Sequence, residues 1–247
     1  GAQSPGCAGV LGGGGRRRPR RRGHLASEPK VDRATWRRGM STSTDAAEGE
    51  RVYGADAAAV AEPEILAGIE DLRGAIEQVP STVSAVKVGG KRAYALARAG
   101  EPVPLSARRV TVSRFELLSL RRGDAVTDLD VLVECSGGTY VRALARDLGA
   151  ALAVGGHLTA LRRIRVGPYG LDVACTLEEL AAQPRLWAEL DDVVATAFGH
   201  RLVDSQPAWV LAPGGSLHAV GLAATHAAID SQGAAIALRA RTRPHGL

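Results

Sequence analysis

The chain has 247 residues, 45% of them hydrophobic, which is enough to bury one large core or two smaller ones. It contains no run of about 18 apolar residues, so we expect no membrane-spanning helix and no membrane partner. The net charge of +5 is uneven, because six arginines lie in one stretch: Arg16, Arg17, Arg18, Arg20, Arg21 and Arg22. Such a run binds polyanions without sequence specificity.

The cysteines argue against a disulfide framework and a metal site. They are odd in number and share no metal-type spacing: Cys7, Cys135 and Cys175. No apolar stretch follows the arginine run as a secretory signal would require. We therefore expect reduced thiols in a cytoplasmic protein without a bound metal, with Cys135 buried at the end of a strand.

The first clear periodicity comes after a long irregular start. Residues 1–38 are rich in Gly and Arg and show almost no repeating apolar pattern, so we expect no folded element there. Glu62–Gln78 is predicted to be a helix, with a proline in its first turn and one apolar stripe: Pro63, Ile65, Ile69, Leu72 and Ile76. A short strand is expected over Ser84–Val88 and a basic helix over residues 91–100.

Strands and a helix alternate in the middle of the chain. Val110–Leu120 and Asp128–Cys135 are predicted strands, and the second has an apolar residue at every other position. Val141–Ala153 is a predicted helix and His157–Arg165 a strand-like segment. From about Gly199, short apolar runs between turn residues predict a small β-rich module: Ala219–Leu222, Ala227–Ile229 and Ala234–Leu238.

Two segments could carry chemistry. In CSGGTYVR, residues 135–142, a glycine pair before a helix would let backbone N–H groups approach an anion, and Arg142 would add a guanidinium. The alternative is a tight turn with a surface arginine. A second segment mixes cations with an aromatic ring, as RNA-contacting surfaces do, or is a solvated helix face: Lys87, Lys91, Arg92 and Tyr94.

Three long motifs lie between Gln78 and Tyr169. They are QVPSTVSAVKVGGKRAYALARAGEPV, CSGGTYVRALARDLG and HLTALRRIRVGPY. In content, order and spacing they resemble the bacterial tRNA pseudouridine-55 synthase (TruB) family. The C-terminal part resembles the small domain of its actinobacterial members, cut short before its last strand.

The resemblance implies an α+β fold: a mixed, mainly antiparallel sheet flanked by helices, plus a small β-rich, PUA-like C-terminal domain. Residues 41–198 would form the synthase domain and residues 199–247 the small domain, after a degenerate segment 1–40. The implied activity is isomerisation of one uridine in the TψC arm of tRNA to pseudouridine. An aspartate attacks the flipped-out nucleotide without metal or organic cofactor. We expect a monomer whose partner is tRNA.

The resemblance also assigns individual residues. Arg142 falls on the arginine that keeps the aspartate ionised and oriented. Tyr140 and Leu161 fall on positions that line the uracil pocket. A further set is expected to contact RNA: Lys87, Lys91, Arg92, Tyr94, Arg162 and Arg163.

The aspartate is not found where the family has it. GAQSPGCAGVL, followed by GGGGRRRPRRRGHL, aligns without a gap to the family's nucleophile region and places Ser4 at the aspartate position. In KVDRATWRRG the family's lysine is kept as Lys30, but Asp32 stands where a pocket tyrosine belongs. A serine without an adjacent base is no substitute nucleophile, and we expect neither Asp32 nor Asp45 to replace it. The chain as written should therefore lack turnover.

Two origins of this departure stay open. The chain is either a degenerate or truncated relative, or its first forty or so residues record a wrong reading frame of a GC-rich gene, which the Gly/Arg/Pro bias favours. Three functions follow: an active isomerase, a tRNA-binding remnant that helps the RNA fold, or a fragment whose incomplete sheet exposes edges and core.

Deleting residues 1–22 should make RNA binding less sensitive to salt, because the arginine run supplies much of the sequence-independent attraction. We expect a shallower slope of log affinity against log salt when labelled tRNA is titrated between about 50 and 200 mM salt. An unchanged slope would assign the electrostatic contribution to the rest of the chain.

Overall fold

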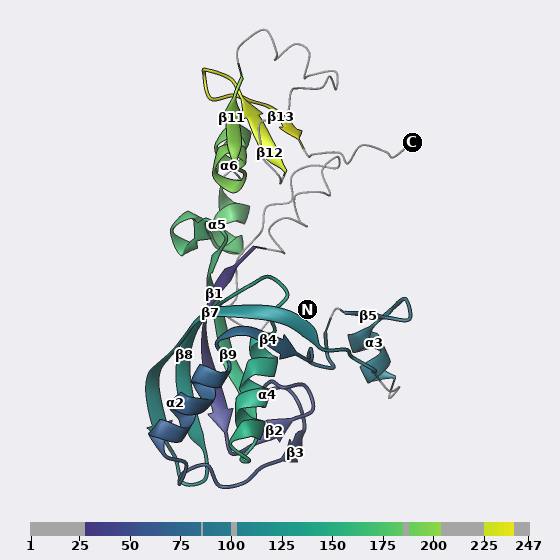
Figure 1. Cartoon of the computed structure of the whole chain (residues 1–247), viewed down its shortest axis with the longest axis vertical. Coiled ribbons are helices and arrows are strands. Elements are labelled where there is room, and N and C mark those ends of the chain that lie inside the picture. Colours follow the sequence, from purple (N-terminus) through teal and green to yellow (C-terminus); the bar gives the residue numbers. More distant parts are fainter. Residues whose placement is uncertain (1–27, 85, 100–102, 185–187, 204–224, 240–247) are drawn as a thin grey trace. The chain divides into compact units, whose positions relative to one another are not determined.

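A computed structural model of the chain describes the following residues: 28–84, 86–99, 103–184, 188–203 and 225–239 (Figure 1). The chain divides into two compact units, Gly1–Cys175 and Thr176–Leu247. No helix among the described residues is long and apolar enough to cross a membrane. The same residues hold no group of acidic, histidine or cysteine side chains placed to bind a metal ion.

The first unit is built on a six-stranded sheet in the order β10-β9-β1-β8-β7-β4, with every pair antiparallel. The strands are β1 (Lys30–Arg38), β4 (Gly74–Gln78), β7 (Arg108–Arg122), β8 (Thr127–Cys135), β9 (Gly156–Val166) and β10 (Tyr169–Gly170). The strands expected near residues 110–120, 128–135 and 157–165 are confirmed as β7, β8 and β9. The predicted α+β class with a mainly antiparallel sheet is confirmed as well.

Two helices, α2 (Glu62–Asp71) and α4 (Val141–Ala151), pack against one face of this sheet (Figure 1). Strand β8 alternates buried and half-buried positions along its whole length, as its sequence pattern predicts. Its buried side chains share one core with those of the helices: Ile65, Ile69, Leu144, Leu148, Leu129, Val131, Val133 and Cys135. We call this side of the sheet the helix face and the opposite side the outer face.

Strand β1 lies in the middle of the sheet, although residues 1–38 were not expected to form a folded element. Alternate residues of β1 point to the helix face: Lys30, Asp32, Ala34, Trp36 and Arg38. Three of these five are charged, so the strand lacks the alternating apolar signal that would reveal it in the sequence. Pairing with β8 and β9 along its whole length outweighs this unfavourable composition.

The helix predicted over Glu62–Gln78 is correct only in its first part. Helix α2 begins as expected, with Pro63 in its first turn, but it ends at Asp71. Gly74 then adopts a φ of +78°, which suits glycine, and β4 begins there. Ile76 continues the helical spacing by coincidence, because in the structure it pairs with Val110 of β7.

Shorter elements complete the first unit. They are β2 (Ser41–Thr42), β3 (Arg51–Tyr53), β5 (Lys87–Val88), β6 (Lys91–Arg92), α3 (Ala93–Arg98) and the 3-10 turn η1 (Leu171–Val173). The strand expected over Ser84–Val88 is thus confined to its last two residues. The helix expected over residues 91–100 begins at Ala93, after a hairpin turn through Gly89 and Gly90, and Gly100 lies outside the described residues.

The second unit holds a small three-stranded sheet, which confirms the predicted C-terminal β-structure. Its elements are α5 (Leu177–Ala182), α6 (Leu190–Ala197), β11 (His200–Leu202), β12 (His226–Ile229) and β13 (Ala235–Arg239). Val194 of α6 packs against Ala227 and Ile229 of β12. The domain boundary was expected between residues 198 and 199. In the structure this point lies inside the second unit, between α6 and β11, and the unit itself begins at Thr176. The strand expected over Ala219–Leu222 lies outside the described residues.

Arg38 is an unfavourable element of the first unit's core. The residue is 2% exposed, and its Nη2 donates one long hydrogen bond of 3.5 Å to the Leu148 carbonyl. Its Nε and Nη1 have no partner among the described residues. Burial lowers the pKa of the guanidinium to about 10, because the cation loses its hydration.

Replacing Arg38 with Met should raise the free energy of unfolding by about 2 kcal/mol, because it removes an uncompensated buried charge. The folded-state pKa of about 10 lies below the ordinary pKa of an arginine, so the penalty is complete at any pH well below 10. Urea unfolding should therefore show the same gain from about pH 6 to about pH 9.

The neighbouring Arg37 provides the matched control. Its guanidinium makes two hydrogen bonds of 2.8 Å with Asp128 on the outer face. Arg37→Met should therefore be neutral or lower stability by about 0.5 kcal/mol. A destabilised Arg38→Met variant would show that the buried guanidinium has favourable partners after all.

Candidate functional site

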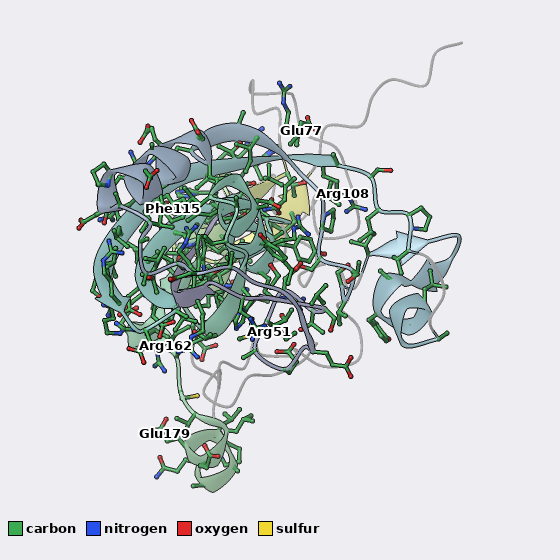
Figure 2. The ribbon with its side chains drawn as sticks, turned by 90° about the horizontal axis from the view of Figure 1, so that it is seen from below. Arg51, Glu77, Arg108, Phe115, Arg162 and Glu179 are labelled. Carbon is green, nitrogen blue, oxygen red and sulfur yellow. The ribbon has the colours of Figure 1, made fainter. Side chains whose placement is uncertain are left out.

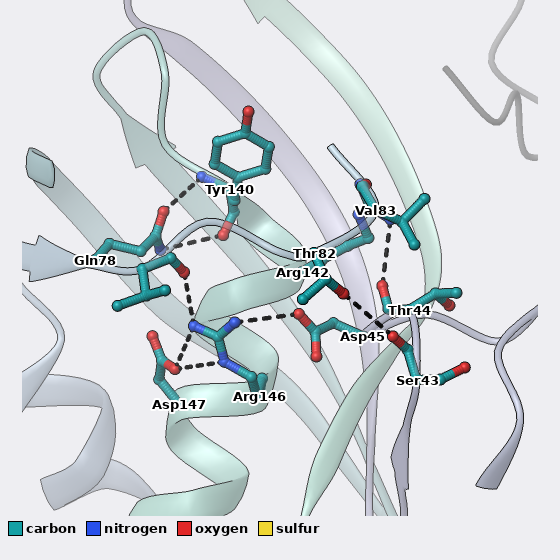
Figure 3. A network of polar contacts seen from close by, with 11 residues as sticks. Ser43, Thr44, Asp45, Gln78, Thr82, Val83, Tyr140, Arg142, Arg146 and Asp147 are labelled. Atoms are coloured by element: carbon teal, nitrogen blue, oxygen red, sulfur yellow. Dashed lines mark hydrogen bonds and ion pairs between the residues drawn. The ribbon is translucent and has the colours of Figure 1, made fainter. Parts of the chain in front are cut away.

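Tyr140 lies directly before α4, and the side-chain amide of Gln78 forms hydrogen bonds with both its N–H and its carbonyl (Figure 3). The Tyr140 N–H donates to Gln78 Oε1 at 2.8 Å, and Gln78 Nε2 donates to the Tyr140 carbonyl at 3.2 Å. Gln78 ends β4 and is 2% exposed. A buried amide from the sheet thus fixes the N-cap residue, directly before the helix. Because the apolar spacing predicts a helix through Gln78, the sequence gives no signal for this role.

The turn before α4 is held by its own hydrogen bonds. Gly138 has a φ of +84°, the Thr139 N–H donates to the Ser136 carbonyl at 3.3 Å, and the two hydroxyl oxygens lie 3.2 Å apart. Lys30 Nζ donates to the Thr139 carbonyl at 2.5 Å, which ties β1 to the turn. Burial lowers the pKa of Lys30, and the nearby Arg163 lowers it further. These contacts fit the tight-turn alternative for the segment CSGGTYVR.

Arg142, in the first turn of α4, reaches away from the helix toward two loops (Figure 3). Its guanidinium donates to the Val83 carbonyl at 2.8 Å and to the Thr44 carbonyl at 3.3 Å. Within the described part of the chain it has no carboxylate partner. The carbonyls orient the guanidinium but leave its charge without a counter-ion, so Arg142 can receive an anionic group.

One helical turn later, Arg146 contacts the same two loops (Figure 3). Its guanidinium lies 3.3 Å from Asp45 Oδ2, donates to the Val79 carbonyl at 2.8 Å and donates to Asp147 Oδ1 at 2.8 Å. Burial raises the pKa of Asp147, while Arg146 acts in the opposite direction. Arg142 and Arg146 together brace loops 43–45 and 79–83 against α4, a role that the sequence did not reveal for Arg146.

Leu161 and Arg163 of β9 lie on the helix face, beside this helix. Leu161 is opposite Ala34 and packs against the core that contains Val141 of α4. Arg163 is opposite Asp32, with Nε–Oδ1 and Nη2–Oδ2 distances of 2.8 and 3.2 Å. Asp32 is 0% exposed, so this two-point ion pair is its counter-charge. Arg163 thus has a carboxylate partner within the chain, while its side chain is 43% exposed. Its expected contact with RNA stays a prediction.

The remaining residues expected to contact RNA lie elsewhere. Arg162 is exposed on the outer face, at the periphery of the first unit, whereas Phe115 lies inside it (Figure 2). Tyr94 is 38% exposed on α3. The positions of the three cations at the hairpin are on β5 and β6: Lys87, Lys91 and Arg92. Ser4 lies outside the described residues.

Solved structures share this fold. A chain from a Cbf5–Nop10–Gar1 complex aligns with a TM-score of 0.62 and 20% identity, over 87% of this chain and 60% of its own length. A chain from an H/ACA RNP bound to a substrate RNA aligns with a TM-score of 0.58 and 18% identity, over 87% and 59%. The chain thus spans about three fifths of these solved chains. The likeness shows that these proteins share one fold.

Sequence comparison identifies one family. The profile of the TruB family pseudouridylate synthase N-terminal domain matches residues 5–141, and that of the tRNA pseudouridylate synthase B C-terminal domain matches residues 142–198. Proteins named tRNA pseudouridine synthase B from Nocardia farcinica, Rhodococcus jostii and Mycobacterium tuberculosis are 53%, 52% and 49% identical. These matches cover 96% of this chain and 78–80% of the relatives. The chain belongs to the TruB family of tRNA pseudouridine synthases, and the predicted likeness to actinobacterial members is confirmed.

Replacing Arg163 with Gln should lower the free energy of unfolding by about 2–3 kcal/mol, because it leaves the buried Asp32 carboxylate without its counter-ion. The same change at the exposed Arg162 should alter stability by less than about 0.5 kcal/mol. Urea unfolding of both variants at neutral pH makes the comparison. Equal stabilities would remove the basis for treating Arg163 as a structural counter-ion.

Proposed function

We propose that this chain is a tRNA-binding protein that keeps the framework for isomerising uridine-55 of the TψC arm to pseudouridine but lacks the nucleophile needed for turnover. The observation that carries the proposal is the environment of Arg142. It is held at the start of α4 by two backbone carbonyls, and it has no carboxylate partner among the described residues. This is the environment expected of an arginine whose anionic partner is supplied by another segment or by the substrate.

The residues around Arg142 support a site for a flipped-out uracil. Tyr140 is fixed two residues earlier by Gln78, and Leu161 lies on the adjacent part of β9. An aromatic ring and an aliphatic side chain are suited to a base that has left its stack. An arginine beside them would keep an attacking aspartate ionised and oriented.

The carboxylates near Arg142 are already engaged. Asp32 is buried against Arg163, and Asp45 is paired with Arg146. Releasing either of them would leave an unpaired charge behind, which argues against their use as the nucleophile. We assign Ser4 to the nucleophile position from the gapless register of residues 1–25. The family match that begins at residue 5 supports a common origin of the segment that follows Ser4. A serine hydroxyl without an adjacent base stays protonated near neutral pH.

The proposal includes the partners expected from the resemblance. Residues of the β5–β6 hairpin and α3 would contact RNA phosphates and bases: Lys87, Lys91, Arg92 and Tyr94. The protein would act as a cytoplasmic monomer. The family's chemistry needs no metal or organic cofactor, because a carboxylate serves first as nucleophile and then as leaving group.

The direct test is pseudouridine formation on an unmodified tRNA transcript, with protein in excess over RNA. The chain as written should bind the transcript and form no product, because position 4 carries a hydroxyl. Ser4→Asp, alone or with Asp32→Tyr, should produce pseudouridine at position 55. Ser4→Asn is the matched control, since it has the shape of aspartate without the charge.

Each outcome bears on a separate part of the proposal. Product from the unmodified chain would show that another carboxylate acts as nucleophile. Product from Ser4→Asp that disappears on adding Arg142→Gln would support both assignments. Failure to prefer tRNA over an unrelated RNA duplex would overturn the proposal as a whole.

A further inference from the structure

Strand β9 carries two consecutive arginines that face opposite sides of the sheet. Successive side chains of a strand alternate between its faces. Arg163 points to the helix face, where it is the counter-ion of the buried Asp32. Arg162 points to the outer face and is exposed. The two adjacent arginines therefore have different environments and should have different roles.

The outer face of β1, β7, β8 and β9 is densely charged, and its carboxylates are all engaged. These strands direct four carboxylates to this face, and an arginine from the same strands pairs with each of them. The pairs are Arg37–Asp128 at 2.8 Å, Arg114–Glu116 at 2.7 Å, Arg165–Glu134 at 2.7 Å and Arg121–Asp130. No acid of these four strands is left over to neutralise a further cation on this face.

Two arginines that lie opposite each other on the outer face have no counter-ion among the described residues. Arg33 of β1 lies directly opposite Arg162 of β9 in the strand register. Both are exposed, and neither has a hydrogen bond or ion pair within the described residues. On the other side of Arg33 the register partner is Leu132, which is uncharged. Like charges directly opposite each other on neighbouring strands repel, so this pair is unfavourable in the free protein.

We propose that Arg33 and Arg162 form a phosphate-binding site on the outer face, which contacts the tRNA backbone away from the uracil site. A phosphate between two guanidinium groups accepts several charge-assisted hydrogen bonds and relieves their repulsion. RNA supplies such groups at every nucleotide, and contacts of this kind position a nucleic acid without reading its sequence. The inference rests on the proposed tRNA binding.

The position of the pair in the sheet suits this contact. On the edge of β9 that faces away from β1, β10 pairs with Val166 and Arg165, and Ala46 forms a single bridge with Leu158. Arg162 lies between these two contacts, close to the edge of the sheet. Arg142 and Leu161 serve the helix face. A TψC stem–loop bound at the helix face would occupy that face of the sheet. Another part of a complete tRNA could extend past the edge at β9 and reach the outer face. Both arginines stand on paired strands, which hold them in a fixed spacing.

The test compares two double variants of the full chain that lower the net charge equally. Arg33→Gln/Arg162→Gln removes the unpaired arginines. Arg114→Gln/Arg121→Gln removes two paired arginines from the same face and is the control. Affinity for a labelled full-length tRNA transcript and for its isolated TψC stem–loop is measured across a salt series, after thermal melts have shown that both variants are folded.

The first variant should bind full-length tRNA about tenfold more weakly at low salt. Because one phosphate contact is lost, its slope of log affinity against log salt should be shallower by about 1. Its affinity for the isolated stem–loop should be unchanged, and the control should keep the wild-type slope. The proposed site would be overturned by an equal loss of affinity in both variants, by an equal loss of affinity for stem–loop and tRNA, or by no loss of affinity. If wild-type protein does not prefer tRNA over an unrelated duplex, the proposed function fails instead, independently of how the variants compare.

Discussion

The first unit depends on the pairing of β1 with both of its neighbours. Strand β1 joins β9 and β10 to β8, β7 and β4, so without it the sheet would fall into two parts. Helix α4 is tied to the same strand at both ends, through Lys30 to the Thr139 carbonyl and through Arg38 to the Leu148 carbonyl. The start of α4, where the candidate site lies, is therefore positioned by a strand whose residues on the helix face are mostly charged.

The site itself is assembled largely by backbone carbonyls and one buried amide. Gln78 holds Tyr140, the N-cap residue of α4, and Arg142 and Arg146 each bridge loops 43–45 and 79–83. Carbonyl acceptors fix a guanidinium without neutralising it, so the arrangement keeps a cation ready for an anionic partner. Arg146 differs from Arg142 because it already has carboxylate partners, Asp45 and Asp147. The two arginines contact the same loops, but of the two only Arg142 has no carboxylate partner among the described residues.

Charge is divided between the two faces of the sheet by the alternation of side chains along each strand. On the helix face, a charged group is tolerated only with a counter-ion, as for Asp32, or at a cost in stability, as for Arg38. On the outer face, water screens charges, and arginines pair with carboxylates from neighbouring strands. The pair formed by Arg33 and Arg162 stands out against this background because the nearby acids are already engaged.

The sequence by itself determined the family, the strands β7, β8 and β9, and the core of α4, because motif spacing and apolar periodicity are local properties of the chain. It also named Tyr140, Arg142 and Leu161, through motifs long enough to be specific. Tertiary structure alone decided that residues 30–38 form the central strand and that Ile76 belongs to a strand. It alone decided that Arg163 neutralises Asp32 while Arg162 faces the opposite side. The physical reason is that the stability of a buried charge, and the secondary structure of a short polar segment, depend on partners distant in the chain, which no local pattern encodes.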